Sequence, residues 1–118
     1  MVKVTKEALA RILELCKSAY PYEVNGLLLG KAVVDDFVLM PSEYGHFSVV
    51  TRMHDVPIYP SASGTFHSHP SPDNRPSAAD RRFFSKAWKN HLIVGYPYTP
   101  RTVAAYDSTG KAQGFEIV

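Results

Sequence analysis

Residues 64–80 read Gly-Thr-Phe-His-Ser-His-Pro-Ser-Pro-Asp-Asn-Arg-Pro-Ser-Ala-Ala-Asp, and they predict three different kinds of backbone in succession. Gly64–His69 is predicted to be a strand, because it is short, bounded by punctuating residues and contains β-branched and aromatic side chains. Residues 70–76 contain three prolines and are predicted to be a loop. A helix is predicted from Ser77 to Trp88. The segment therefore joins a strand to a helix through a short connection.

Two histidines and one aspartate in this segment form a candidate metal-binding set. His67 and His69 are two positions apart on the predicted strand, so both imidazoles project from the same face. Asp80 lies on the predicted helix, which could return it to the histidines. Two imidazoles and one carboxylate can hold Zn²⁺ and leave a fourth position for water, which is typical of a catalytic zinc site. The spacing therefore predicts a zinc hydrolase.

Asp80 also has an explanation that needs no metal. Phe83, Phe84 and Ala87 define the buried side of the predicted helix and place Asp80 on that side, where an unpaired carboxylate is costly. Alternatively, Ser77 and Asp80 could form a capping box, in which each side chain bonds the backbone amide of the other residue. The two explanations are compatible if Ser77 caps the helix and also presents its hydroxyl group to the metal site.

The composition limits the possible classes of protein. The 118 residues predict one domain over residues 1–118, and the formal charge of +2 gives no case for nucleic-acid binding. Cys16 is the only cysteine, which excludes an intrachain disulfide and the cysteine pair of a zinc nucleobase deaminase. No apolar run approaches the roughly 20 residues that cross a bilayer. The N-terminus lacks the pattern of a secretory signal, so we expect a cytoplasmic protein with no membrane partner.

The remaining chain predicts a mixture of helices and strands. A strand at residues 2–4 precedes an amphipathic helix that Thr5 caps and Pro21 ends. Asn25-Gly26 predicts a turn. Further strands are predicted at residues 27–29, 37–40, 47–51, 91–96, 102–106 and 114–118, with a hairpin turn at 107–110. This mixture of elements indicates the α/β (α+β) class.

A zinc hydrolase also needs a group that takes a proton from the attacking water and passes it to the leaving group. The helical zinc-protease motif His-Glu-x-x-His is absent, so this base must come from another part of the chain. Spacing alone leaves the choice open among several carboxylates, including Glu14, Glu23, Asp35, Glu43 and Asp55. A cysteine nucleophile is disfavoured, because Cys16 lies on the apolar stripe of the predicted first helix.

Three segments together resemble the JAMM (MPN+) metalloprotease family. They are Glu23-Val24-Asn25-Gly26, His67-Ser68-His69-Pro70 and Ser77-Ala78-Ala79-Asp80. The shared pattern is a glutamate, a His-x-His pair, seven residues and Ser-x-x-Asp, and the resemblance extends over essentially the whole chain. It implies a curved mixed β-sheet flanked by helices, the MPN/JAB domain, with a cytidine-deaminase-like architecture. The short length is similar to that of the minimal archaeal form.

The resemblance also implies a role for each residue of the motif. His67, His69 and Asp80 become the zinc ligands. Glu23 becomes the general acid/base that holds the catalytic water, and Ser77 becomes the hydroxyl group that steadies the oxyanion. The implied reaction is cleavage of an isopeptide or peptide bond after the C-terminal Gly-Gly of a ubiquitin-like modifier, in archaea a small sulfur-carrier-type protein.

Two alternatives remain open. One is processing of sulfur-carrier precursors or adducts with the same zinc, and the other is a non-catalytic zinc-bound scaffold that binds ubiquitin-like proteins. For the isopeptidase, the modifier tail is expected to lie extended beside a strand edge, which residues 47–60 are predicted to provide. His46, His54 and His91 match nothing in the motif and are predicted to be ordinary surface or core residues.

Overall fold

The computed structural model describes residues 1–40, 59–86 and 88–118. The predicted strand at 47–51 lies outside the described residues, as does most of the expected tail-binding edge at 47–60. His46 and His54 also lie outside them.

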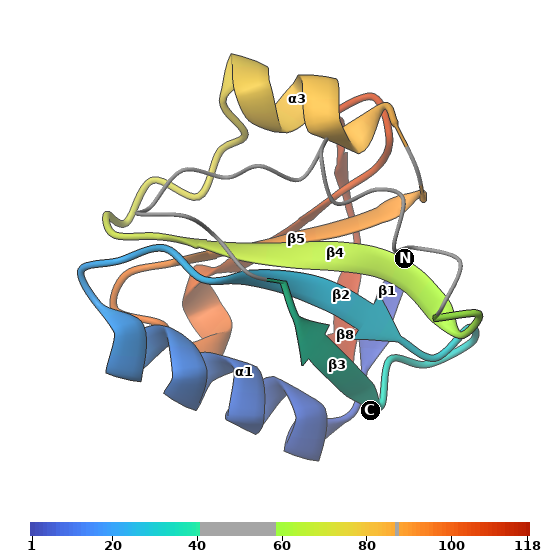
Figure 1. Ribbon diagram of the computed structural model, residues 1–118, viewed down its shortest axis with the longest axis horizontal. Coiled ribbons are helices and arrows are strands. Elements are labelled where there is room, and N and C mark those ends of the chain that lie inside the picture. The colour runs from blue at the N-terminus through green and yellow to red at the C-terminus, as the bar shows by residue number, and fades with distance from the viewer. Residues whose placement is uncertain (41–58, 87) are drawn as a thin grey trace.

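A six-stranded mixed sheet forms the centre of the fold, with the strand order β3-β2-β4-β5-β6-β7. Strands β4 and β5 are parallel, and the other neighbouring strands are antiparallel. Strands β1 and β8 pair in parallel as a separate small sheet. Figure 1 shows α1 on one face of the large sheet and α3 on the opposite face. This confirms the predicted mixed sheet flanked by helices. The elements are β1 (Val2–Val4), α1 (Lys6–Ala19), β2 (Asn25–Leu29), β3 (Asp36–Leu39), β4 (Ala62–His69), α3 (Ala78–Phe84), β5 (Asn90–Gly95), a 3₁₀ turn (Pro100–Thr102), β6 (Val103–Tyr106), β7 (Ala112–Gln113) and β8 (Phe115–Ile117).

Helix α1 forms as its sequence predicts. The Thr5 side chain accepts a hydrogen bond from the Ala8 amide at 3.1 Å, and Glu7 lies in the first turn, where its charge suits the helix dipole. The helix ends at Ala19, two residues before Pro21, which cannot continue it. Its apolar stripe is buried against the large sheet. Among the described residues, no helix is long and apolar enough to cross a bilayer.

Strand β4 separates two apolar clusters because its side chains alternate between the faces of the sheet. Phe66 belongs to the larger cluster, which contains the apolar stripe of α1. On the opposite face, Phe83 and Phe84 of α3 pack with Ile93 and Tyr106. The His67 imidazole lies on this second face, with its ring centroid 6.3 Å from that of Phe84. The predicted strand face therefore points the histidines toward α3.

One predicted element boundary is wrong, and one short strand was not predicted. The predicted helix from Ser77 to Trp88 is shorter, because α3 ends at Phe84 and Trp88 has a φ of 61°, which a right-handed helix cannot accommodate. The predicted strand at 114–118 forms as β8 (Phe115–Ile117), and an additional short strand, β7 (Ala112–Gln113), precedes it. Strand β7 continues the hairpin from β6, and β8 leaves the large sheet to pair with β1. The predicted turn at 107–110 is confirmed between β6 and β7, with Gly110 at a φ of 83°.

The predicted turn at Asn25-Gly26 is also wrong, because both residues belong to β2. Gly26 pairs with Leu39 of β3 and with Phe66 of β4. A Cβ atom at Gly26 would lie 2.5 Å from the Val38 carbonyl oxygen and 2.6 Å from the Phe66 ring. Glycine is therefore required here for close packing between strands and not for a turn.

The substitution Gly26→Ala should lower the free energy of unfolding by about 1–3 kcal/mol, because the added methyl group overpacks the sheet. Urea denaturation followed by circular dichroism measures the effect. Gly114→Ala is the matched control, since the nearest atom to its added Cβ is the Met1 side-chain Cε at 3.2 Å, the end of a flexible chain. Equal losses in the two variants would contradict the close-packing explanation.

Candidate metal centre

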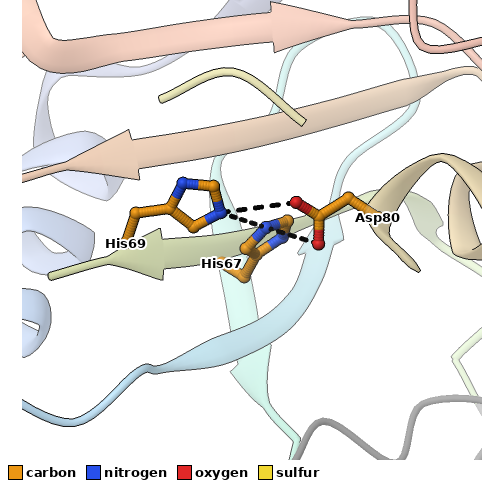
Figure 2. A group of neighbouring side chains, drawn as sticks. All are labelled: His67, His69 and Asp80. Carbon is orange, nitrogen blue, oxygen red and sulfur yellow. Dashed lines mark hydrogen bonds and ion pairs between the residues drawn. The ribbon is translucent and has the colours of Figure 1, made fainter. Parts of the chain in front are cut away.

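Three side chains from two elements converge on one point. His67 and His69 project from alternate positions of β4, and Asp80 reaches them from α3 (Figure 2). The two Nε2 atoms are 3.2 Å apart. Asp80 Oδ1 lies 3.2 Å from His67 Nε2, and Asp80 Oδ2 lies 3.4 Å from His69 Nε2. One ligand atom from each of the three residues lies within 4.8 Å of the others, so the predicted set is brought together.

The spacing of these atoms fits a small tetrahedral cation. Zinc bonds of about 2.0–2.1 Å at tetrahedral angles place neighbouring ligand atoms about 3.3 Å apart. In the site the two imidazole nitrogens are 3.2 Å apart, and each lies 3.2–3.4 Å from one of the two Asp80 oxygens, which is close to that separation. Two imidazole nitrogens and one carboxylate oxygen are also ligands that zinc accepts. The residues present therefore fit the metal that the sequence predicts.

The protonation of the His69 ring is fixed by its backbone partner. His69 Nδ1 lies 2.8 Å from the Asp73 carbonyl oxygen, which can only accept a hydrogen bond, so Nδ1 must carry the proton. In the neutral imidazole, Nε2 then holds a lone pair directed at the shared point. A ring nitrogen bonded to a carbonyl is the usual support for a metal-binding histidine.

Asp80 serves the helix and the site together. Its Oδ2 accepts a hydrogen bond from the Ser77 amide at 2.8 Å, and its own amide donates to Ser77 Oγ at 3.0 Å. The capping box that offered a metal-free explanation is thus present, and Asp80 still faces both histidines. Its side chain is only 13% exposed, as expected for a residue on the buried side of α3.

The electrostatics of the cluster favour a bound cation. Burial acts to raise the pKa of Asp80, but the hydrogen bonds to His67 and His69 hold it well below its usual range. Burial acts to lower the pKa of His69, but the hydrogen bonds to Asp80 and the Asp73 carbonyl, together with the charges of Asp80 and Glu23, raise it above its ordinary value of 6.5. Asp80 is therefore ionised at neutral pH and attracts positive charge to the site.

The pairing of β2 with β4 brings Glu23 to the same end of the sheet. Asn25 is opposite His67. Val24, the residue before Asn25, forms two hydrogen bonds with Ser68. The Ser68 amide donates to the Val24 carbonyl, and the Val24 amide donates to Ser68 Oγ, both at 2.9 Å. Glu23 is the residue immediately before Val24 in the sequence. It is exposed, and its charge contributes to the raised pKa of His69.

Ser77 lies at the rim of the site as the N-cap of α3. The residue is exposed, and it lines a cavity of about 410 Å³ together with His69. Its oxygen accepts the hydrogen bond from the Asp80 amide, which leaves the hydroxyl proton able to donate to another group. Ser77 can therefore cap the helix and still present its hydroxyl group to the cavity.

Two residues that could have supplied other chemistry belong to the core. Cys16 is buried, and burial raises the pKa of its thiol to about 11, so it is not a thiolate at neutral pH. His91 is also fully buried, with Nδ1 2.7 Å from the Thr65 hydroxyl group and its ring stacked on Phe84 at 4.2 Å. The predicted core role of Cys16 is confirmed, and His91, predicted to be an ordinary surface or core residue, belongs to the core.

The sequence did not reveal the contacts that hold the loop beside His69. The Tyr106 hydroxyl group donates to the Asn74 carbonyl at 2.8 Å, and the Asn74 side-chain amide donates to the Thr102 carbonyl at 2.9 Å. These bonds fix the residue next to Asp73, whose carbonyl orients His69. The partners are 28 and 32 positions apart in sequence, so no local pattern could have paired them.

Substitution of Asn74 should weaken metal binding although Asn74 is not a ligand. Asn74→Ala removes the side-chain bond to the Thr102 carbonyl, one of the two bonds that hold the loop, and so loosens the Asp73 carbonyl. We expect zinc affinity to fall by about 10-fold, as for other residues that orient a ligand. Competition with a chromogenic chelator measures the affinity. Asn90→Ala is the matched control, because its amide bonds the Ser63 carbonyl at the far end of β4. An unchanged affinity in Asn74→Ala would contradict the orienting role.

Comparisons with known proteins agree with this site. The family described as "Prokaryotic homologs of the JAB domain" matches residues 5–108. A Haloferax volcanii protein named "Probable metalloprotease" is 31% identical over 130 residues, which cover 100% of this chain and 80% of the relative. A solved JAB1/MPN domain protein from Archaeoglobus fulgidus is 36% identical, with a TM-score of 0.81 and 99% of each chain covered.

A further solved structure, described as JAMM, a metalloprotease-like zinc site in the proteasome and signalosome, is 34% identical to this chain. Its TM-score is 0.79, and the match covers 100% of this chain and 98% of the other. The fold resemblance suggested by the motif is thus confirmed over the whole chain. The protein belongs to the prokaryotic JAB family of JAMM-type metalloproteases, with His67, His69 and Asp80 as its candidate metal site.

Proposed function

We propose that this protein is a zinc-dependent isopeptidase that hydrolyses the bond after the C-terminal Gly-Gly of a ubiquitin-like modifier. The observation that carries the proposal is the convergence of His67, His69 and Asp80, in which the two imidazole nitrogens lie 3.2 Å apart and each lies 3.2–3.4 Å from one of the two Asp80 oxygens. Three protein ligands leave a fourth tetrahedral position, which is characteristic of catalytic zinc sites. Membership of the JAMM-type family supports the reaction class.

Glu23 is proposed as the general acid/base. Zinc held by His67, His69 and Asp80 would lower the pKa of a water ligand to about 7 and polarise the carbonyl under attack. Glu23 would accept the proton from the attacking water and donate it to the departing lysine amine, so that both proton transfers use one carboxylate. Its position beside His69, held by the bonds between Ser68 and Val24, supports this assignment.

Ser77 is proposed to stabilise the oxyanion. When the carbonyl carbon becomes tetrahedral, negative charge develops on its oxygen, and a fixed hydroxyl donor stabilises that charge. The Ser77 oxygen is held by the Asp80 amide, so the hydroxyl group is pre-oriented at the N-terminus of α3. Its place on the same cavity as His69 supports contact with the carbonyl.

The proposed substrate is a conjugate between the modifier and a lysine amine. Glycines in the modifier tail have no side chains, so they allow its backbone to approach a crowded metal site closely. The modifier is proposed to be a small sulfur-carrier-type protein, as the motif resemblance implies. Residues 47–60 remain the predicted edge for binding the extended tail.

Removal of the metal should abolish cleavage. We expect about one zinc per chain by atomic emission, and we expect a chelator to stop hydrolysis of Gly-Gly–lysine conjugates until zinc is returned. The same assay is run with C-terminally extended sulfur-carrier precursors. Cleavage of precursors alone would favour the processing role, whereas bound zinc without cleavage of either substrate would favour a scaffold.

The substitution Glu23→Gln should lower kcat by about 10²- to 10⁴-fold, because the amide cannot accept the water proton. Zinc content should not change, since Glu23 is not a ligand. Steady-state kinetics on an isopeptide conjugate and metal analysis provide the two measurements. The control is Glu14→Gln, which alters an exposed carboxylate of α1 paired with Lys17 at 3.7 Å. Near-normal turnover of Glu23→Gln would show that another group is the base.

The substitution Ser77→Gly separates the two roles of this serine. Glycine is tolerated at an N-cap at a cost of only a few tenths of a kcal/mol, so stability should change little. Loss of the hydroxyl donor should lower kcat by about 10²-fold or more. Thermal unfolding and kinetics measured on the same preparation compare the two effects. Unchanged kcat with an intact fold would limit Ser77 to capping.

A further inference from the structure

The cavity beside the metal site has a charged wall that the proposed mechanism does not use. This cavity, of about 410 Å³, is formed by the loop after β4 and the beginning of α3. His69 and Ser77 line one part of it, and Asp73, Arg75 and Arg81 supply its charged groups. A group that occupies the cavity would therefore lie within a few bonds of the carbonyl that is attacked.

Two of the three charged groups neutralise each other. Arg75 Nε donates to Asp73 Oδ1 at 2.9 Å, and a terminal nitrogen of Arg75 donates to Asp73 Oδ2 at 3.0 Å. The charges of this pair therefore balance. Arg81 forms no ion pair with any residue in the part of the chain that the structure describes. It therefore gives the cavity an excess of positive charge.

The position of Arg81 is restricted by the hairpin between β6 and β7. A Cβ atom built at Gly110 would lie 2.9 Å from Arg81 Cγ and 3.3 Å from Arg81 Nε. The stem of Arg81 therefore lies close to Gly110 in this turn, where a larger residue would crowd it. A side chain that is already held in place loses less conformational entropy when it binds a ligand.

We propose that Arg81 forms a subsite for a carboxylate of the substrate, an Asp or Glu side chain located within a few residues of the scissile bond. A guanidinium group matches a carboxylate in charge and in its two-point hydrogen-bonding geometry. The proposal rests on the proposed isopeptidase function, since it identifies a preference of that same site. The carboxylate can come from the modifier tail or from the protein that carries the lysine.

The test uses synthetic isopeptides in which a peptide ending in Gly-Gly is joined to the lysine of a second peptide. One probe carries Glu near the glycines, one carries Glu near the lysine, and a third carries Gln at both places. Binding is measured by fluorescence anisotropy on the full-length, zinc-loaded Glu23→Gln protein, which should not consume the probes. We expect one Glu probe to bind about three- to tenfold more tightly than the Gln probe, an effect that decreases with added salt.

The substitutions Arg81→Gln and Arg82→Gln, each made in the Glu23→Gln protein, distinguish a local contact from general charge attraction. Both residues are exposed on α3 and lose the same charge, but only Arg81 lines the cavity. Arg81→Gln should abolish the preference for Glu while binding of the Gln probe stays constant, and Arg82→Gln should retain the preference. The Glu probe that binds more tightly identifies the side of the scissile bond.

The subsite is overturned if Glu and Gln probes bind equally, if both variants lose the preference to the same extent, or if no probe binds. Cleavage of the same probes by the wild-type protein is assayed separately. An Arg81-dependent preference in binding without any cleavage would overturn the proposed function and leave the subsite supported. Cleavage by the wild-type protein without an Arg81-dependent preference in binding would overturn the subsite and leave the proposed function supported.

Discussion

The Asp80 carboxylate, held between a helix N-terminus and two imidazoles, is the interaction on which the site depends. A partly buried carboxylate is unfavourable unless donors or cations surround it. One of its oxygens accepts a hydrogen bond from the Ser77 amide, and both oxygens face the histidines of β4. Because Asp80 both belongs to the capping box of α3 and completes the donor set, the helix cannot move along the sheet without separating the donors. The contacts of Asp80 with His67 and His69 therefore fix the position of α3 relative to β4.

The remaining parts of the site are carried by the sheet. Strand β4 is paired on both sides, antiparallel with β2 and parallel with β5, so His67 is fixed by two registers. The same pairing delivers Glu23, because the hydrogen bonds between Ser68 and Val24 extend the pairing past the end of β2. Only His69 is oriented by a loop, and that loop is itself bonded to the region of β6. Regular elements therefore carry the three side chains of the donor set.

The sequence predicted the donor set because its evidence is local. Alternation along a strand placed His67 and His69 on one face, and the apolar neighbours Phe83 and Phe84 turned Asp80 inward. The errors occurred where distant segments decide the outcome. Gly26 resembles a turn residue, but it is needed because Phe66 and β3 approach its backbone closely. The pairing of the C-terminal strand β8 with β1 was not predicted either, because it joins segments from the two ends of the chain. The contact of Arg81 with Gly110 has the same origin.

The burial of Cys16 has a practical consequence. The thiol lies in the core with its pKa raised to about 11, so very little reactive thiolate exists at neutral pH. Alkylating reagents should leave it untouched as long as the chain is folded. A cysteine introduced on the surface would then be the unique attachment point for a fluorophore or spin label, without any need to remove the native residue. Distances between such a label and a bound modifier could be measured on an otherwise unaltered core.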